Sequence, residues 1–131
     1  MFDNYGNSLC NKGITMNLET FREYCLSKKG VTEELPFGPD TLVYKVMGKI
    51  FALTGFDFSR LSLKNFPEKN QEIRAEYQAV EGAYHMNKIH WNSVNFDGTI
   101  KDALLREWID ESYKIVAHSL TKKLQEELKN L

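Results

Sequence analysis

The chain has 131 residues, of which 42% are hydrophobic and 27% charged, with 8 Phe, 6 Tyr and 2 Trp, so it can bury the core of one globular domain. The net charge of −1 lacks the basic excess that is typical of nucleic-acid-binding proteins. No apolar run approaches 18 residues, which excludes a membrane-spanning helix, and the N-terminus does not resemble a secretory signal. Cys10 and Cys25 are too few for a disulfide framework, so we expect a cytoplasmic protein.

The N-terminal part predicts an extension followed by a helix. Residues 1–15 are polar and without periodicity, so we expect a disordered extension before a single domain of residues 16–131, and Met16 could serve as an alternative start. Asn17 is a good helix cap, and the apolar stripe that follows it predicts a helix to about Ser27. Lys28-Lys29-Gly30 is typical of a helix end.

Three strands are predicted next. The segment from Val31 to Thr41 contains two prolines and a glycine and is expected to be a loop. Leu42–Met47 and Lys49–Thr54 are rich in β-branched, aromatic and aliphatic residues on either side of Gly48, which predicts a tight hairpin. The segment Arg60–Lys64 alternates strictly between polar and apolar residues, as a half-buried strand does.

A helix and a second hairpin follow. Pro67 is typical of a first helical position. Ala79–His85 and His90–Phe96 then predict two strands, and a two-residue Asn87-Lys88 turn would place His85 opposite His90.

The C-terminal part predicts two helices. Thr99 resembles the cap of a long helix to about Ser119, which would pack across the sheet through Leu104, Trp108 and Tyr113. A short helix follows from Thr121. The predicted order α-β-β-β-α-β-β-α-α gives an α+β fold, with five antiparallel strands in one sheet and the helices packed on one face.

Recognised catalytic motifs are absent from the sequence. It contains no glycine-rich phosphate loop, GxSxG elbow or CxxC pair, so we expect a non-enzymatic protein without a cofactor. His85 and His90 could share one face of the hairpin, but that face offers no third ligand, and we expect no metal site. Cys25 lies on an apolar helix stripe and is best interpreted as a core residue.

Both predicted hairpins carry a lysine at the turn, in Gly48-Lys49 and in Asn87-Lys88. A basic hairpin tip can enter a DNA groove or contact its phosphates. A lysine at a turn also protects a sheet against aggregation without any other role. The pattern favours the two interpretations equally. Between Leu42 and Lys64, however, four basic residues stand against Asp57 alone, so the first hairpin and the next strand form a locally positive region.

One run closely resembles the signature of the MmcQ/YjbR family of small bacterial proteins: Gly82-Ala-Tyr-His-Met-Asn-Lys-Ile-His-Trp-Asn-Ser-Val94. The segments Asn17–Cys25, Thr32–Phe37 and Leu42–Leu53 are similar to the opening helix, loop and hairpin of that family. The similarity covers about residues 16–131. It implies a fold like that of the frataxin homologue CyaY and a double-wing arrangement in which hairpins bind DNA. Ile89 departs from the family pattern, because a lysine is common there.

The resulting hypothesis is a DNA-binding domain with weak, sequence-independent affinity. The residues expected to contact DNA are Lys45, Lys49, Arg60, Lys64, His85, Asn87, Lys88, His90 and Asn92. The first alternative is a protein-interaction module in which the signature run secures the fold. A second, by analogy with CyaY, is metal handling, but that role needs an acidic helical ridge and these helices mix both signs.

Overall fold

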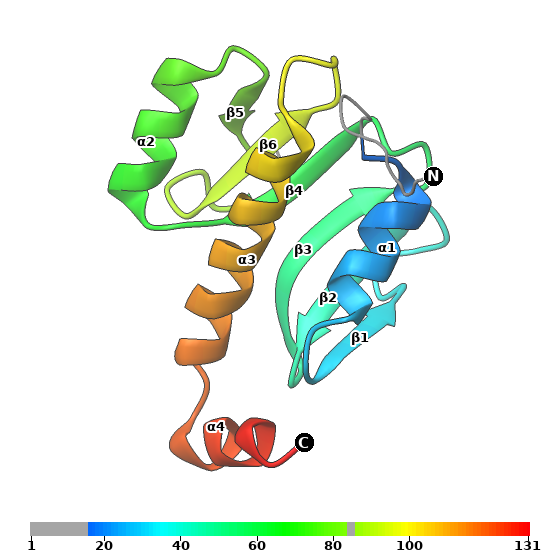
Figure 1. The fold of residues 1–131 in the computed structure, drawn as a ribbon, viewed down its shortest axis with the longest axis vertical. Coiled ribbons are helices and arrows are strands. Elements are labelled where there is room, and N and C mark those ends of the chain that lie inside the picture. Colours follow the sequence, from blue (N-terminus) through cyan, green and yellow to red (C-terminus); the bar gives the residue numbers. More distant parts are fainter. Residues whose placement is uncertain (1–15, 84–85) are drawn as a thin grey trace.

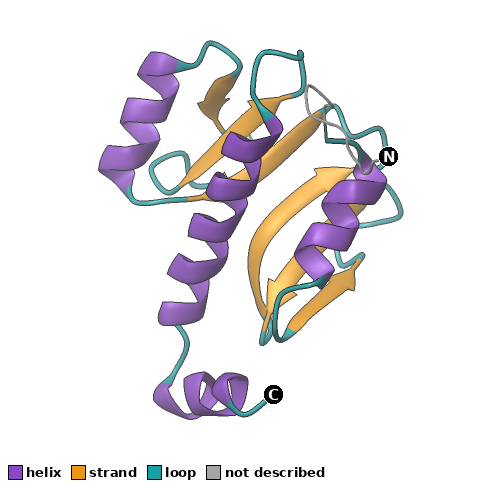
Figure 2. Ribbon diagram, in the orientation of Figure 1, coloured by secondary structure: helices purple, strands orange, loops and turns teal. Residues whose placement is uncertain are grey.

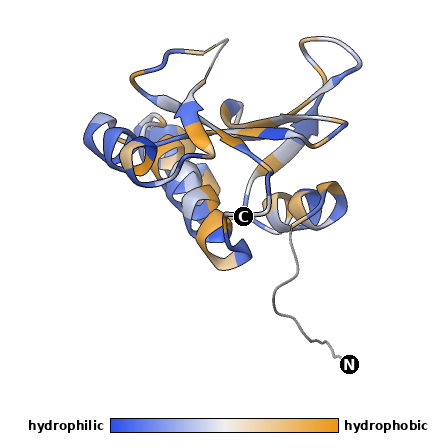
Figure 3. Ribbon diagram, turned by 90° about the horizontal axis from the view of Figure 1, so that it is seen from above, coloured by the Kyte–Doolittle hydropathy of each residue, from blue (hydrophilic) through white to orange (hydrophobic). Residues whose placement is uncertain are grey.

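The computed structural model describes residues 16–83 and 86–131, which form one α+β unit (Figure 1). Six strands make a single antiparallel sheet in the order β1-β2-β3-β4-β6-β5. Helices α1, α2 and α3 lie on one face of this sheet (Figures 2 and 3). The elements are α1 (Leu18–Leu26), β1 (Val31–Glu34), β2 (Thr41–Val46), β3 (Lys49–Gly55), β4 (Arg60–Lys64), α2 (Pro67–Glu76), β5 (Val80–Gly82), β6 (Trp91–Asn95), α3 (Asp102–His118) and α4 (Lys122–Lys129).

The first helix and the first hairpin confirm the sequence prediction. The Asn17 side chain accepts a hydrogen bond from the Thr20 amide at 2.8 Å and caps α1. β2 and β3 pair directly around Met47 and Gly48, whose φ angles are 49° and 90°. Positive φ at both central residues gives the primed turn whose twist matches that of the strands.

The prediction of five strands was wrong, because the expected loop contains β1, which pairs with β2 at the sheet edge. Two acidic residues of β1, Glu33 and Glu34, form ion pairs with basic residues of neighbouring elements. Arg22 donates to both carboxylate oxygens of Glu33, at 2.6 and 2.9 Å. Lys45 on β2 forms an ion pair with Glu34 at 3.0 Å. Acidic residues disfavour a strand in sequence patterns, but cross-strand and helix-to-strand ion pairs stabilise this one.

The second hairpin differs in register from the prediction. β5 and β6 pair Val80 with Val94 and Gly82 with Asn92, one residue away from the register of a two-residue turn. The Asn87 carbonyl accepts from the amides of both His90 and Trp91, so the chain makes a wider turn before β6 begins. The sequence predicted a strand over Ala79–His85. Among the described residues, the strand covers only Val80–Gly82.

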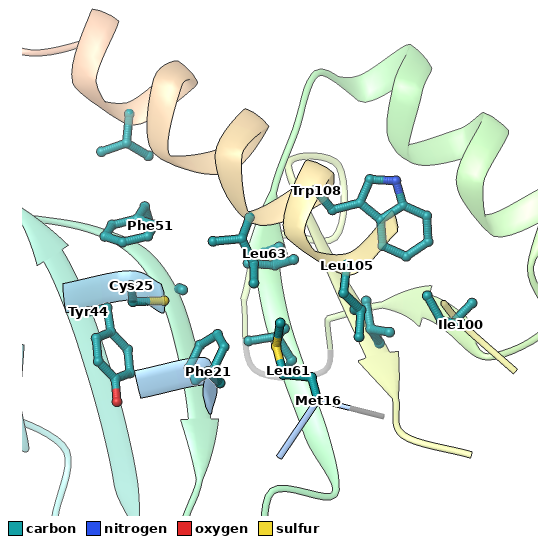
Figure 4. Packing of buried hydrophobic residues seen from close by; sticks show 14 of the residues in the cluster. Met16, Phe21, Cys25, Tyr44, Phe51, Leu61, Leu63, Ile100, Leu105 and Trp108 are labelled. Atoms are coloured by element: carbon teal, nitrogen blue, oxygen red, sulfur yellow. The ribbon is translucent and has the colours of Figure 1, made fainter. Parts of the chain in front are cut away.

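The core lies between the sheet and the helices α1, α2 and α3, and α3 contributes many of its buried side chains. Leu105, Trp108 and Ile109 on α3 are at most 4% exposed, and Trp108 meets the Tyr77 ring edge-to-face at 5.4 Å between centroids. Figure 4 shows part of this core, with Leu105 and Trp108 labelled. Trp108 confirms the expected packing, whereas Leu105 rather than Leu104 is the fully buried leucine. Thr99 does not cap α3, because its hydroxyl donates to Asp97 at 2.6 Å.

Ser112 on α3 completes the sheet at a place where β3 and β4 separate. These strands pair at only three positions, the last being Ala52 with Leu63. Beyond it, the Ser112 hydroxyl donates to the Phe51 carbonyl at 2.5 Å and accepts from the Lys64 amide at 2.8 Å. A side chain of a helix therefore occupies the position of the next rung of the ladder.

Candidate functional site

The sheet face opposite the helices, called the open face below, is the candidate site. Strand pairing aligns Val43, Leu53, Ser62 and Ser93 across four strands on this face. In Figure 3 the helices lie below the sheet, and two loops rise above it on the other side. One loop joins β1 to β2 and the other joins β5 to β6, so they start from opposite edges of the sheet.

Both loops line one cavity of about 500 Å³ on the open face. Phe37 comes from the β1–β2 loop and Met86 from the β5–β6 loop, while Leu53, Ser62 and Ser93 form the floor. Cavities of this size that are mainly apolar with a few polar groups are typical ligand sites.

The floor and the rim of the cavity carry hydrogen-bonding and charged groups. Ser93 is 1% exposed, and among the described residues its hydroxyl has no hydrogen-bond partner. Such buried unpaired hydroxyls are uncommon in proteins. Arg60 and Asp57 are exposed and line the cavity. The Asp57 carboxylate accepts from the amide and the hydroxyl of Ser59, both at 3.2 Å.

Three of the basic residues predicted to bind DNA lie on or beside the open face. Arg60 lies at the start of β4, beside the cavity. Lys64, at the end of the same strand, places its ammonium 6.0 Å from the centre of the Trp91 ring. Lys45 lies on β2, but its ion pair with Glu34 offsets its charge.

Lys49 does not join them. Its ammonium lies 3.4 Å from the Ser119 carbonyl at the end of α3. There a second cavity of about 510 Å³ opens between α3 and α4. Lys49 does not line this cavity, but four lysines do: Lys29, Lys114, Lys122 and Lys129. We call it the lysine groove. Lys49 is thus separated from Arg60 and Lys64 on the open face.

Much of the signature run supports the second hairpin. The Asn87 carboxamide accepts from the Ile89 amide at 2.8 Å and shapes the turn. Asn92 is 4% exposed and accepts from Arg74 at 2.6 Å, so it is not available on the surface. Arg74 also donates to the Lys88 carbonyl, which ties α2 to the loop. Sequence reasoning missed this role of Arg74, since nothing local marks it.

The remaining predicted residues are His85, Lys88 and His90. Lys88 and His90 are exposed on the β5–β6 loop. The Lys88 side chain packs against Gly82, where an added Cβ would lie 3.2 Å from two of its carbons. His85 falls outside the described residues. Within residues 16–83 and 86–131, no three His, Cys, Asp or Glu side chains are grouped so that they could hold a metal ion. No helix in that part of the chain is long and apolar enough to span a bilayer.

Ionised groups cluster away from the cavity, at the junctions of α1 with β1 and of α1 with α3. Hydrogen bonds from Arg22 and Tyr44 lower the pKa of Glu33, against the effect of burial. Burial opposes ionisation of Asp110, but hydrogen bonds from Lys28 and Tyr24 outweigh it and lower the pKa of that carboxyl. Burial raises the pKa of the Cys25 thiol, which keeps it protonated and unreactive. The lowered pKa values of the two carboxyl groups stabilise the fold near neutral pH.

The fold and the comparisons together define the class. The chain forms an antiparallel sheet with helices on one face. The YjbR family model matches residues 26–115, and the chain belongs to that family. The uncharacterized protein YbdF of Escherichia coli O157:H7 is 36% identical over 115 residues, which cover 85% of this chain and 93% of that one. The uncharacterized protein YjbR of E. coli K12 is 29% identical over 101 residues, covering 76% and 86%.

Solved structures agree with the fold. A Deinococcus radiodurans protein with a DUF419 domain superimposes with a TM-score of 0.78 and 38% identity, over 86% of this chain and 87% of that one. A Pseudomonas syringae protein gives a TM-score of 0.67 and 26% identity, over 77% and 99%. The α+β fold that the resemblance implied is therefore confirmed, with six strands in place of five.

Proposed function

We propose that the protein binds DNA through the open face, without catalysis. The observation that carries this proposal is the pair of loops that rise from opposite edges of the helix-free face, with Arg60 and Lys64 between them. Loops of this kind can straddle a nucleic-acid backbone while the sheet contacts phosphates.

The electrostatics favour weak binding. Lys45 is neutralised by Glu34, and the Lys49 ammonium lies at the end of α3, so the proposed phosphate contacts of the sheet are assigned to Arg60 and Lys64. Two phosphate contacts correspond to a slope of about −2 for log K against log salt. Phosphate contacts carry no sequence information, so the affinity is largely independent of sequence.

Titration of a labelled duplex at several salt concentrations tests this proposal. The double variant Arg60→Gln/Lys64→Gln should flatten the salt slope by about two. The matched control is Lys114→Gln/Lys122→Gln, which removes the same charge from the lysine groove and should leave the slope unchanged. If both double variants flattened the salt slope equally, the phosphate contacts would not be specific to Arg60 and Lys64. Absence of binding at low salt would reject DNA binding altogether.

A protein-interaction role is the second candidate, because Phe66 and Ile89 are each 61% exposed. The amide of Asn65 donates to the His90 carbonyl, which brings the segments that carry these two side chains together. Exposed apolar side chains that gather in one place are typical of binding surfaces. If the duplex fails to bind, a loss of self-association or partner binding in Phe66→Ser would support this role.

A further inference from the structure

The cavity on the open face combines a mainly apolar lining with hydroxyl groups at its floor. The hydroxyls of Ser62 and Ser93 lie at paired positions of β4 and β6 and face the same side of the sheet. Ser93 is 1% exposed and has no partner among the described residues, although a buried hydroxyl ordinarily forms a hydrogen bond. The floor of the cavity therefore offers donors and acceptors to a ligand.

The walls and the rim complement a planar, anionic molecule. Phe37 is 64% exposed from one loop, and Met86 lines the cavity from the other. Aromatic and thioether side chains both make favourable contacts with aromatic rings. At the rim, Arg60 provides a planar donor group suited to phosphate, and Asp57 can accept from hydroxyl groups of a sugar.

We infer that this cavity binds one phosphorylated heterocycle of nucleotide size. The ring would lie between Phe37 and Met86, its polar edge on Ser62 and Ser93, and its phosphate at Arg60. The inference rests on the proposed function, since it assigns the same face to a nucleic-acid component. A free nucleoside monophosphate and an unpaired base of a single strand share this chemistry. A cavity of about 500 Å³ lies within the range of small-ligand sites.

Two variants remove the predicted ligand contacts with little effect on folding. Ser93→Ala removes a hydroxyl that has no hydrogen-bond partner within residues 16–83 and 86–131, so it should not lower the urea midpoint of unfolding, while ligand affinity should fall about three- to tenfold. Phe37→Ala removes an exposed ring and should weaken binding roughly tenfold. Phe66→Ala is the matched control, because Phe66 is 61% exposed and does not line the cavity, and its affinity should equal that of the wild type.

The probes are AMP, dTMP and a labelled oligo-dT. Binding is measured by changes in amide chemical shifts and, for the labelled oligonucleotide, by fluorescence anisotropy. Shifts at Ser62 and Ser93 with a mononucleotide support the free ligand as source, and shifts with the oligonucleotide alone support an unpaired base. Absence of shifts with every probe overturns the inference. If duplex binding depends on Arg60 and Lys64 but not on Phe37 or Ser93, the proposed function stands and the inference fails. If the mononucleotide binds and the duplex does not, the cavity stands without the proposed duplex contacts.

Discussion

Replacing Ser112 with alanine should destabilise the protein far more than the loss of one hydroxyl suggests. The Ser112 hydroxyl satisfies the Lys64 amide and the Phe51 carbonyl at the place where β3 and β4 separate. Ser112 is 0% exposed, so water does not reach these groups in the native state. A buried polar group left without a partner costs about 1–3 kcal/mol. Since two groups are affected and partial relaxation is expected, the free energy of unfolding should fall by about 2–4 kcal/mol.

Urea denaturation followed by far-UV circular dichroism measures this effect. Ser93→Ala is the matched control, because Ser93 is also a buried serine but its hydroxyl has no partner among the described residues. Its unfolding free energy should stay within about 0.5 kcal/mol of the wild type. If Ser112→Ala were as stable as Ser93→Ala, the interpretation of Ser112 as a rung of the sheet would be wrong.

Two further predictions concern the core and acid stability. Trp108→Ala should lower the free energy of unfolding by roughly 3–5 kcal/mol, because the ring is 4% exposed and packs on Tyr77. Free access of acrylamide to Trp108, measured by fluorescence quenching in a Trp91→Phe background, would contradict this packing. The lowered pKa values of Glu33 and Asp110 mean that their stabilisation is complete above their ordinary values of 4.5 and 3.8 and is lost as pH falls through the lower native values. Unfolding measured from about pH 6 to about pH 3 should show this loss, and Glu33→Gln should make the curve shallower, whereas an unchanged curve would count against the Arg22–Glu33 pair.

Local pattern was sufficient for the elements whose contacts are local. The alternation in Arg60–Lys64 predicted β4 with its observed bounds, and Gly48 located the first turn. β1 was missed because its pairing depends on Arg22, on Lys45 and on the rest of the sheet. The register of the second hairpin was wrong because the Asn87 carbonyl and Arg74 set the turn, and neither contact follows from strand periodicity.

For the candidate site too, the sequence predicted residue types but not the contacts that depend on the folded structure. Sequence reasoning identified the basic residues but could not foresee that Lys49 points to the end of α3 while Arg60 lies on the open face. The cavity was missed entirely, since Phe37, in the loop after β1, and Ser93, on β6, line one cavity only when the whole sheet is assembled. The one available signal was Ser93, a small polar residue beside Val94 in a predicted strand.

The short contact between β3 and β4 has a mechanical consequence. Only three residue pairs join the half-sheet β1–β2–β3 to the half-sheet β4–β6–β5, and Ser112 holds them together where those pairs end. Each half carries one of the two loops, and the floor of the cavity crosses the seam between Leu53 and Ser62. A small twist about this seam would therefore change the distance between the loops without breaking either half. Because α3 contacts both β3 and β4, it lies along this seam and would resist such a twist.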